Sequence, residues 1–104
     1  MSQKTATTYQ LYFGKQIQVL NRVVSKLDFA RFLREHVIPE FENFAVVEGT
    51  GYWKGEPEDM FIVTIITENF YDAIVLNGIA EAYKQQFYQD MVLVNTFTCF
   101  PNII

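Results

Sequence analysis

One segment, Ser25–Lys54, constrains the fold of this chain more than any other, because it contains both ends of a helix and the strand that follows. Ser25 is a favourable N-cap, and Asp28, three residues later, can close a capping box with it. Pro39 disfavours helical backbone angles at the residue before it, so we expect the helix to end near Ile38. Helical spacing defines the buried stripe: Leu27, Phe29, Phe32, Leu33, His36 and Val37.

The remaining chain shows three further kinds of local pattern. Alternation of apolar and polar residues, or a β-branched run, predicts four strands over residues 8–13, 44–48, 60–67 and 91–100. A second helix is predicted over residues 72–88, with Asp72 as its N-cap and an apolar stripe of Val75, Ile79, Tyr83 and Phe87. Gly49–Gly51 should break or bulge the second strand, and Gly55–Asp59 should form a hairpin turn.

The order of these elements is β-α-β-β-α-β, which predicts an α+β fold of the ferredoxin-like type. Right-handed crossovers place both helices on one face of a four-stranded antiparallel sheet, with the first and third strands in its centre. A chain of 104 residues forms one domain by length. We therefore expect a single domain over residues 8–104, preceded by a flexible N-terminal tail over residues 1–7.

The apolar content predicts that this domain does not exist as a lone monomer. Half of the residues are hydrophobic and 16% are aromatic, more than the interior of a small domain can hold. The last predicted strand carries apolar residues on both faces: Met91, Leu93 and Phe97 on one, Val92, Val94 and Phe100 on the other. A second copy covering the bare sheet face would solve this problem, which predicts a homodimer of the dimeric α+β barrel type, with a trimer as the alternative.

Charge and cysteine content exclude several classes of function. The net charge is -4 and no basic patch is present, so we expect neither nucleic-acid nor membrane-surface binding. Cys99 is the only cysteine, which excludes an internal disulfide and a thiolate zinc site, and predicts an inert core thiol. Glu56, Glu58 and Asp59 fit a solvated turn better than a calcium loop. We predict no cofactor, no metal and a cytoplasmic location, since no signal peptide or membrane span is visible.

Five residues form the candidate pocket, and none is assigned a catalytic role. His36 is the only histidine and has Glu40 four residues later, so the pair either performs acid–base work or sits at the boundary of the core. Tyr12 either offers a hydroxyl to a pocket or packs in the core. Tyr52 and Trp53, which lie between glycines, either contact a ligand or pack against an oligomer partner.

Two functions fit these observations. The first is a non-catalytic, homo-oligomeric module that binds a small apolar or aromatic ligand or another protein. The second is a cofactor-independent monooxygenase or isomerase of the dimeric α+β barrel type, in which His36 or Tyr12 moves protons; fold analogy alone supports it.

A series of short landmarks connects the chain with a known family. Three landmarks lie in the first half of the chain: a Leu-Tyr-Phe-Gly strand end at Leu11–Gly14, a Phe-x-x-Phe-Leu helix at Phe29–Leu33 and a Val-x-Pro-x-Phe helix stop at Val37–Phe41. Two more follow: a strand ending in Gly-x-Trp at Glu48–Trp53 and a Tyr-x-x-x-Phe-x-Gln helix end at Tyr83–Gln89. In these landmarks the chain resembles a family of small bacterial proteins of unknown function over residues 11–100. It departs from the family at Glu42-Asn43, where the family tends to have Pro-x-Gly, and in a third strand without the usual polar start. The resemblance implies the ferredoxin-like fold and assigns no catalytic residue.

Overall fold

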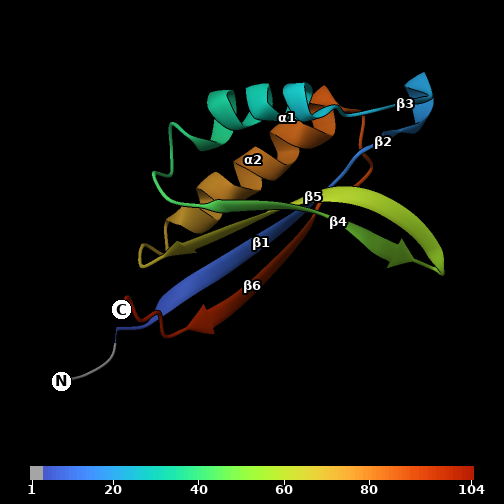
Figure 1. The fold of residues 1–104 in the computed structure, drawn as a ribbon. Helices are drawn as coiled ribbons and strands as arrows, with labels where there is room; N and C mark the ends of the chain where they lie inside the picture. Colours follow the sequence, from blue (N-terminus) through green and yellow to red (C-terminus); the bar gives the residue numbers. More distant parts are fainter. Residues whose placement is uncertain (1–3) are drawn as a thin grey trace.

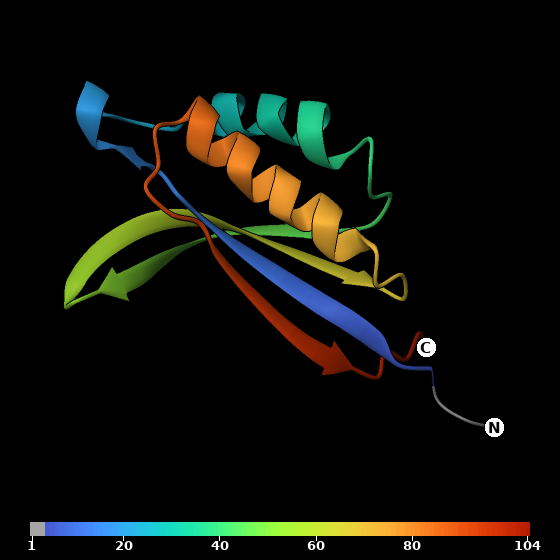
Figure 2. The ribbon, with the colours of Figure 1, turned by 180° about the vertical axis from the view of Figure 1, so that it is seen from behind.

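A four-stranded antiparallel sheet covered on one face by two helices forms the structure, a computed structural model that describes residues 4–104 (Figures 1 and 2). The sheet has the order β4-β5-β1-β6, and its strands are β1 (Ala6–Gly14), β4 (Ala45–Trp53), β5 (Glu56–Thr67) and β6 (Leu93–Cys99). The helices are α1 (Lys26–Phe32) and α2 (Asp72–Gln86). The predicted α+β class, with its antiparallel sheet and two helices, is confirmed.

The first strand starts earlier than the sequence pattern indicates. β1 begins at Ala6, inside the range predicted as a tail, while residues 1–3 of that tail lie outside the described residues. After β1 the chain forms a small projecting hairpin before it enters α1 (Figure 1). The hairpin consists of β2 (Gln16–Ile17), a 3-10 turn η1 (Gln18–Leu20) and β3 (Arg22–Val23).

The start signal of the first helix acts as predicted, and the helical segment ends near Ile38 as expected, although Ile38 itself keeps helical backbone angles before Pro39 (φ -56°, ψ -39°). The Asp28 N–H donates to Ser25 Oγ at 3.0 Å, and the Ser25 N–H donates to Asp28 Oδ2 at 3.3 Å, which closes the capping box. After Phe32 the helix widens into a π-helical turn, η2 (Leu33–Val37), in which the Ile38 N–H donates to the Leu33 carbonyl. The helical segment ends just before Pro39.

Leu27 does not belong to the buried stripe of this helix, contrary to the prediction. Its side chain is 61% exposed, whereas Phe29 and Phe32 are buried. Two residues along an α-helix correspond to a rotation of about 200°, so Leu27 and Phe29 cannot both face the sheet.

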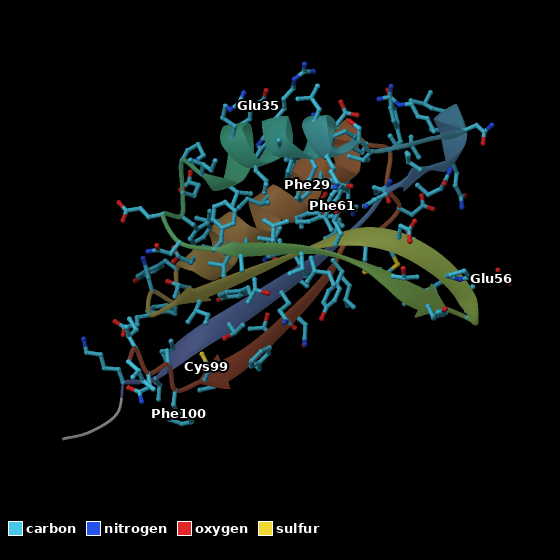
Figure 3. All side chains as sticks on the ribbon, in the orientation of Figure 1. Phe29, Glu35, Glu56, Phe61, Cys99 and Phe100 are labelled. Atoms are coloured by element: carbon cyan, nitrogen blue, oxygen red, sulfur yellow. The ribbon has the colours of Figure 1, made fainter. Side chains whose placement is uncertain are left out.

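Aromatic rings fill the space between the helices and the sheet. Phe13 of β1 lies 4.5 Å from Tyr83 of α2, measured between ring centroids, and Phe29 of α1 stacks on Phe61 of β5 at 4.1 Å (Figure 3). Phe32 contacts Phe13 and Tyr83 edge-on. All five rings are buried. Each such aromatic pair adds about 0.5–1.5 kcal/mol to the stability that burial of its surface already provides, so this cluster dominates the core.

The second helix is shorter than predicted and starts with a different N-cap. Tyr71 occupies the N-cap position, and Asp72 lies in the first turn, where its Oδ2 accepts a hydrogen bond from Thr67 Oγ1 at 2.6 Å. The helix ends at Gln86, and Tyr88 adopts a left-handed backbone angle shortly after. The Asp72 carboxylate therefore does not cap the helix; through its hydrogen bond with Thr67 it connects the end of β5 to the first turn of α2.

The hairpin between β4 and β5 corrects two predictions. Its register runs without a bulge from Ala45–Thr64 to Trp53–Glu56, so Gly49–Gly51 does not interrupt the strand. The turn consists of Lys54 and Gly55 alone, both with positive φ, as a two-residue hairpin turn requires. The segment predicted to be the turn therefore lies mostly within β5.

Candidate functional site

The β4–β5 hairpin extends beyond the rest of the sheet. The pairing of β1 with β5 ends at Gly14–Met60, whereas β4 and β5 continue to pair from Thr50–Asp59 to Trp53–Glu56. We call residues 50–59 the arm. Four residues per strand make it about 13 Å long. The arm bends away from the two helices, and Glu56 lies near its tip (Figures 1, 2 and 3).

The sheet face opposite the helices, here called the open face, carries an apolar row next to the arm. Leu11 and Phe13 are buried under the helices, so the alternate residues of β1 point to the open face. The register aligns one residue from each strand into the apolar row: Val47, Ile62, Tyr12 and Leu93. The next row is more polar and consists of Ala45, Thr64, Gln10 and Asn95.

A groove of about 1130 Å³ lies where the open face meets the arm. Besides the arm and the open face, the small β2–β3 hairpin and the loop after α2 contribute to its walls. Its aromatic and sulfur-containing lining residues are Tyr12, Tyr52, Trp53, Tyr88, Met60 and Met91. The lining combines this aromatic and apolar surface with several polar and charged side chains, a mixture that can orient a small organic molecule.

The structure brings three of the five candidate pocket residues together. Tyr12, Tyr52 and Trp53 line the groove, although they come from two strands and are 40 residues apart in the sequence. By strand alternation Trp53 lies on the same side of β4 as Val47, which places it on the side of the open face. The Tyr12 hydroxyl donates to Gln10 Oε1 at 3.0 Å, so it is already engaged on this face.

His36 and Glu40 do not line the groove. His36 lies in the π-helical turn, where its ring packs 4.7 Å from the ring of Phe32 and its Nε2 lies 3.9 Å from Oε2 of Glu35. Its side chain is 36% exposed. Glu35 projects from the outer side of the π-helical turn η2 (Figure 3), and Glu40 is exposed in the turn that follows. His36 and Glu40 therefore lie on the helix side of the sheet, opposite the open face.

Glu58 and Gly14 are site residues that the sequence interpretation did not identify. Glu58 was predicted to be part of a solvated turn, but it lies in β5 and lines the groove half-buried. Its carboxylate lies against Gly14, where a Cβ atom would collide with Glu58 Oε1. The Lys54-Gly55 dipeptide was the available signal, because recognising it as the turn would have placed Glu58 in the strand.

Lys15, at the rim of the groove, makes its electrostatic contacts with residues that do not line the groove. Lys15 Nζ lies 2.7 Å from Glu48 Oε1, and this hydrogen bond lowers the pKa of the Glu48 carboxyl below its usual range. The same ammonium group lies 4.3 Å from the centre of the Phe61 ring. Lys15 is thus committed to two neighbours, and the acidic groove residues Glu58 and Asp59 receive no ion pair from it within the described residues.

Tyr83 connects the end of β1 to the second helix beneath this rim. Its hydroxyl donates to the Gly14 carbonyl at 2.6 Å, and the side chain is fully buried. Burial raises the pKa of the Tyr83 phenol far above its usual value, and the negative charge of Glu58 adds to the rise. The neutral hydroxyl is the form that the folded protein stabilises.

We expect Tyr83→Phe to lower the free energy of unfolding by about 1–2 kcal/mol near neutral pH, because the hydrogen bond to Gly14 is lost. The pKa of Tyr83 is raised in the folded state, so its contribution is complete below pH 10.0, the unfolded value, and decreases as the pH rises above it. Urea denaturation of both proteins between pH 7 and 11 checks this. The difference between them should narrow above pH 10.0, and a constant difference would contradict the role of this hydroxyl.

In residues 4–104 no group of three or more His, Cys, Asp or Glu side chains is placed to hold a metal ion. No described helix has the length and apolarity needed to cross a membrane. Cys99 lies at the end of the sheet opposite the tip of the arm (Figure 3), and its Sγ accepts a hydrogen bond from Thr8 Oγ1 at 3.0 Å.

The fold and the groove together define a small α+β domain with one open sheet face and an aromatic site at the edge of that face. The chain belongs to the DUF3574 family, described as proteins of unknown function, whose model matches residues 8–100. The predicted membership in a family of unknown function is thereby confirmed. No curated protein matches the chain.

Two solved structures of similar fold are phage enzymes. The first, described as a phage SAM lyase in complex with S-methyl-5′-thioadenosine, has a TM-score of 0.59 and 12% identity, over 97% of this chain and 93% of that chain. The second, a phage SAM lyase in the apo state, has a TM-score of 0.58 and 10% identity, over 100% of this chain and 98% of that chain. At such identities the similarity shows the fold alone.

Proposed function

We propose that this protein is a homo-oligomeric, ferredoxin-like binding module, a dimer of the α+β barrel type, whose groove binds a small apolar or aromatic ligand. The groove that joins Tyr12, Tyr52 and Trp53 carries the proposal. The β-α-β-β-α-β order of the main elements, with β1 and β5 in the middle of the sheet, supports the ferredoxin-like assignment.

The preferred ligand is flat and uncharged or weakly cationic. Aromatic side chains provide stacking surface, and stacking of a base on such a side chain contributes about 1–3 kcal/mol. Four acidic residues line the groove, Glu56, Glu58, Asp59 and Asp90, and they disfavour anions. A fold neighbour that binds S-methyl-5′-thioadenosine makes this neutral nucleoside thioether a reasonable first probe.

The second candidate, a cofactor-independent monooxygenase or isomerase, has less support. It needs an acid–base residue at the ligand, and His36 or Tyr12 was proposed for that role. His36 packs on Phe32 in the helix layer and does not line the groove. Tyr12 lines the groove, but its hydroxyl already donates a hydrogen bond to Gln10 Oε1, so a binding module explains the site with fewer assumptions.

Isothermal titration calorimetry with S-methyl-5′-thioadenosine, adenosine and indole as separate probes tests the proposal. We expect saturable binding of at least one probe, weakened about tenfold by Trp53→Ala because a stacking surface is lost. Phe70→Ala is the matched control, since Phe70 is an exposed aromatic residue that does not line the groove. Absence of binding by all three probes at millimolar concentration, or equal affinities of the wild type and Trp53→Ala, would contradict a ligand site in this groove.

A further inference from the structure

The single chain exposes more surface than a compact protein of its size. Its accessible area is 7389 Å², against about 6,000 Å² expected for a compact monomer of this mass. Its radius of gyration is 14.6 Å, against about 13 Å expected for this length. Exposed apolar residues occur at the chain end (Ile103, Ile104), on the arm (Tyr52, Trp53) and on the open face (Val47, Leu93). The excess of about 1,400 Å² exceeds the roughly 800 Å² that each partner buries in a typical stable interface.

The arm extends past the strand that flanks it in the sheet, beyond a backbone hydrogen bond of 3.0 Å from the Lys15 N–H to the Asp59 carbonyl. Beyond Gly14–Met60 it is a two-stranded ribbon without a neighbouring strand of the sheet, and isolated ribbons of this kind are marginally stable in water. It nevertheless carries two large aromatic residues, Tyr52 at 69% exposure and Trp53 at 56%. Large exposed aromatic residues of this kind are enriched where proteins contact a partner.

The open face provides a complementary surface. Val47 and Leu93, at the two ends of the apolar row, are each more than half exposed, and Phe97 and Ile66 further along the same face are also exposed. The arm bends toward the side of this face and away from the helices (Figures 1 and 2). One surface of the molecule thus contains an uncovered apolar row and a projecting aromatic ribbon beside it.

We propose that two copies of this chain exchange arms: the arm of each copy packs across the open face of the other, and its Trp53 closes the groove of that partner. This inference rests on the proposed homo-oligomeric module and specifies its interface. A two-fold arrangement covers both open faces and supports both arms at once, because each copy donates one arm and receives one. Each groove, already lined by the Trp53 of its own chain, is then covered by the arm of the second copy and is complete only in the dimer.

Trp53 is the only tryptophan in the chain, so its fluorescence reports on the arm without interference from another indole. The experiment follows the emission maximum of Trp53 and its quenching by acrylamide over a dilution series of the wild-type protein, with light scattering on the same samples. We expect the emission to shift to shorter wavelength and quenching to decrease severalfold, in step with dimer formation.

Three outcomes overturn the inference in distinguishable ways. A dimer whose Trp53 emission and quenching do not change with dissociation refutes arm exchange and leaves the homo-oligomer standing. A monomer at every accessible concentration refutes both. Equal dimer dissociation constants for the wild type and Trp53→Lys also refute the exchange, because we expect this charge on an exposed site to weaken the dimer about tenfold or more. Phe70→Lys, at another exposed aromatic residue, is the matched control and should leave the dissociation constant unchanged.

Discussion

Phe13→Ala is expected to lower the free energy of unfolding by about 3–5 kcal/mol, the largest effect of any single substitution considered for this protein. Phe13 is completely buried, and its ring contacts the rings of Phe29, Phe32 and Tyr83. Replacing Phe13 by alanine removes the ring and leaves a cavity, because the three neighbouring rings cannot move far enough to fill it. Because small domains have a total stability of about 5–15 kcal/mol, the loss is a large share of the whole.

Urea denaturation followed by far-ultraviolet circular dichroism measures this effect. Phe70→Ala is the matched control, since it is the same substitution at a side chain that is 72% exposed, and its effect should stay below about 1 kcal/mol. Equal losses for the two variants would show that the aromatic cluster around Phe13 is not the centre of the core.

Ile62→Asp is expected to raise the dissociation constant of the proposed dimer at least about 100-fold, because a carboxylate would be buried without a partner in the middle of the apolar row. Ile62 lies on β5 between Val47 and Tyr12, in the centre of the open face. Sedimentation equilibrium should detect a monomer of 12.1 kDa at concentrations where the wild type is a dimer.

Two further variants separate an interface effect from a folding effect. Leu93→Asp places the same charge on the edge strand β6, where folding tolerates it better, and should also produce a monomer. Ile74→Asp places it on an exposed position of α2 outside the open face and should leave the dimer intact. Dissociation by all three variants, or by none, would argue against the open face as the interface.

Local signals in the sequence predicted the elements that depend on near neighbours. The capping box joins Ser25 and Asp28, three residues apart, and Pro39 directly follows the end of the helical segment, so the sequence shows both signals directly. The period-two alternation of Tyr9, Leu11 and Phe13 identified the first strand and its buried face. These patterns were enough to predict an α+β fold with a four-stranded antiparallel sheet.

The candidate site depended on features that local patterns do not contain. Tyr12 and Trp53 line one groove because the register of β1, β5 and β4 places them on the same face of the sheet, and a shift of one residue would have turned Trp53 to the other face. The hairpin turn lies at Lys54-Gly55, but the glycine, proline and acidic residues of Gly55–Asp59 are a stronger turn signal in the sequence. The turn was therefore predicted at the wrong residues, and the length of the arm was missed.

By itself, then, the sequence determined the two helices, most of each strand of the four-stranded sheet and most of their apolar faces, since these follow from contacts within a few residues. Only the tertiary structure decided that the arm projects past β1, that Glu58 lies against Gly14 and that His36 is remote from the groove. These features arise from pairing between residues far apart in the chain, and the periodic patterns of a sequence contain no information about the geometry of such pairing.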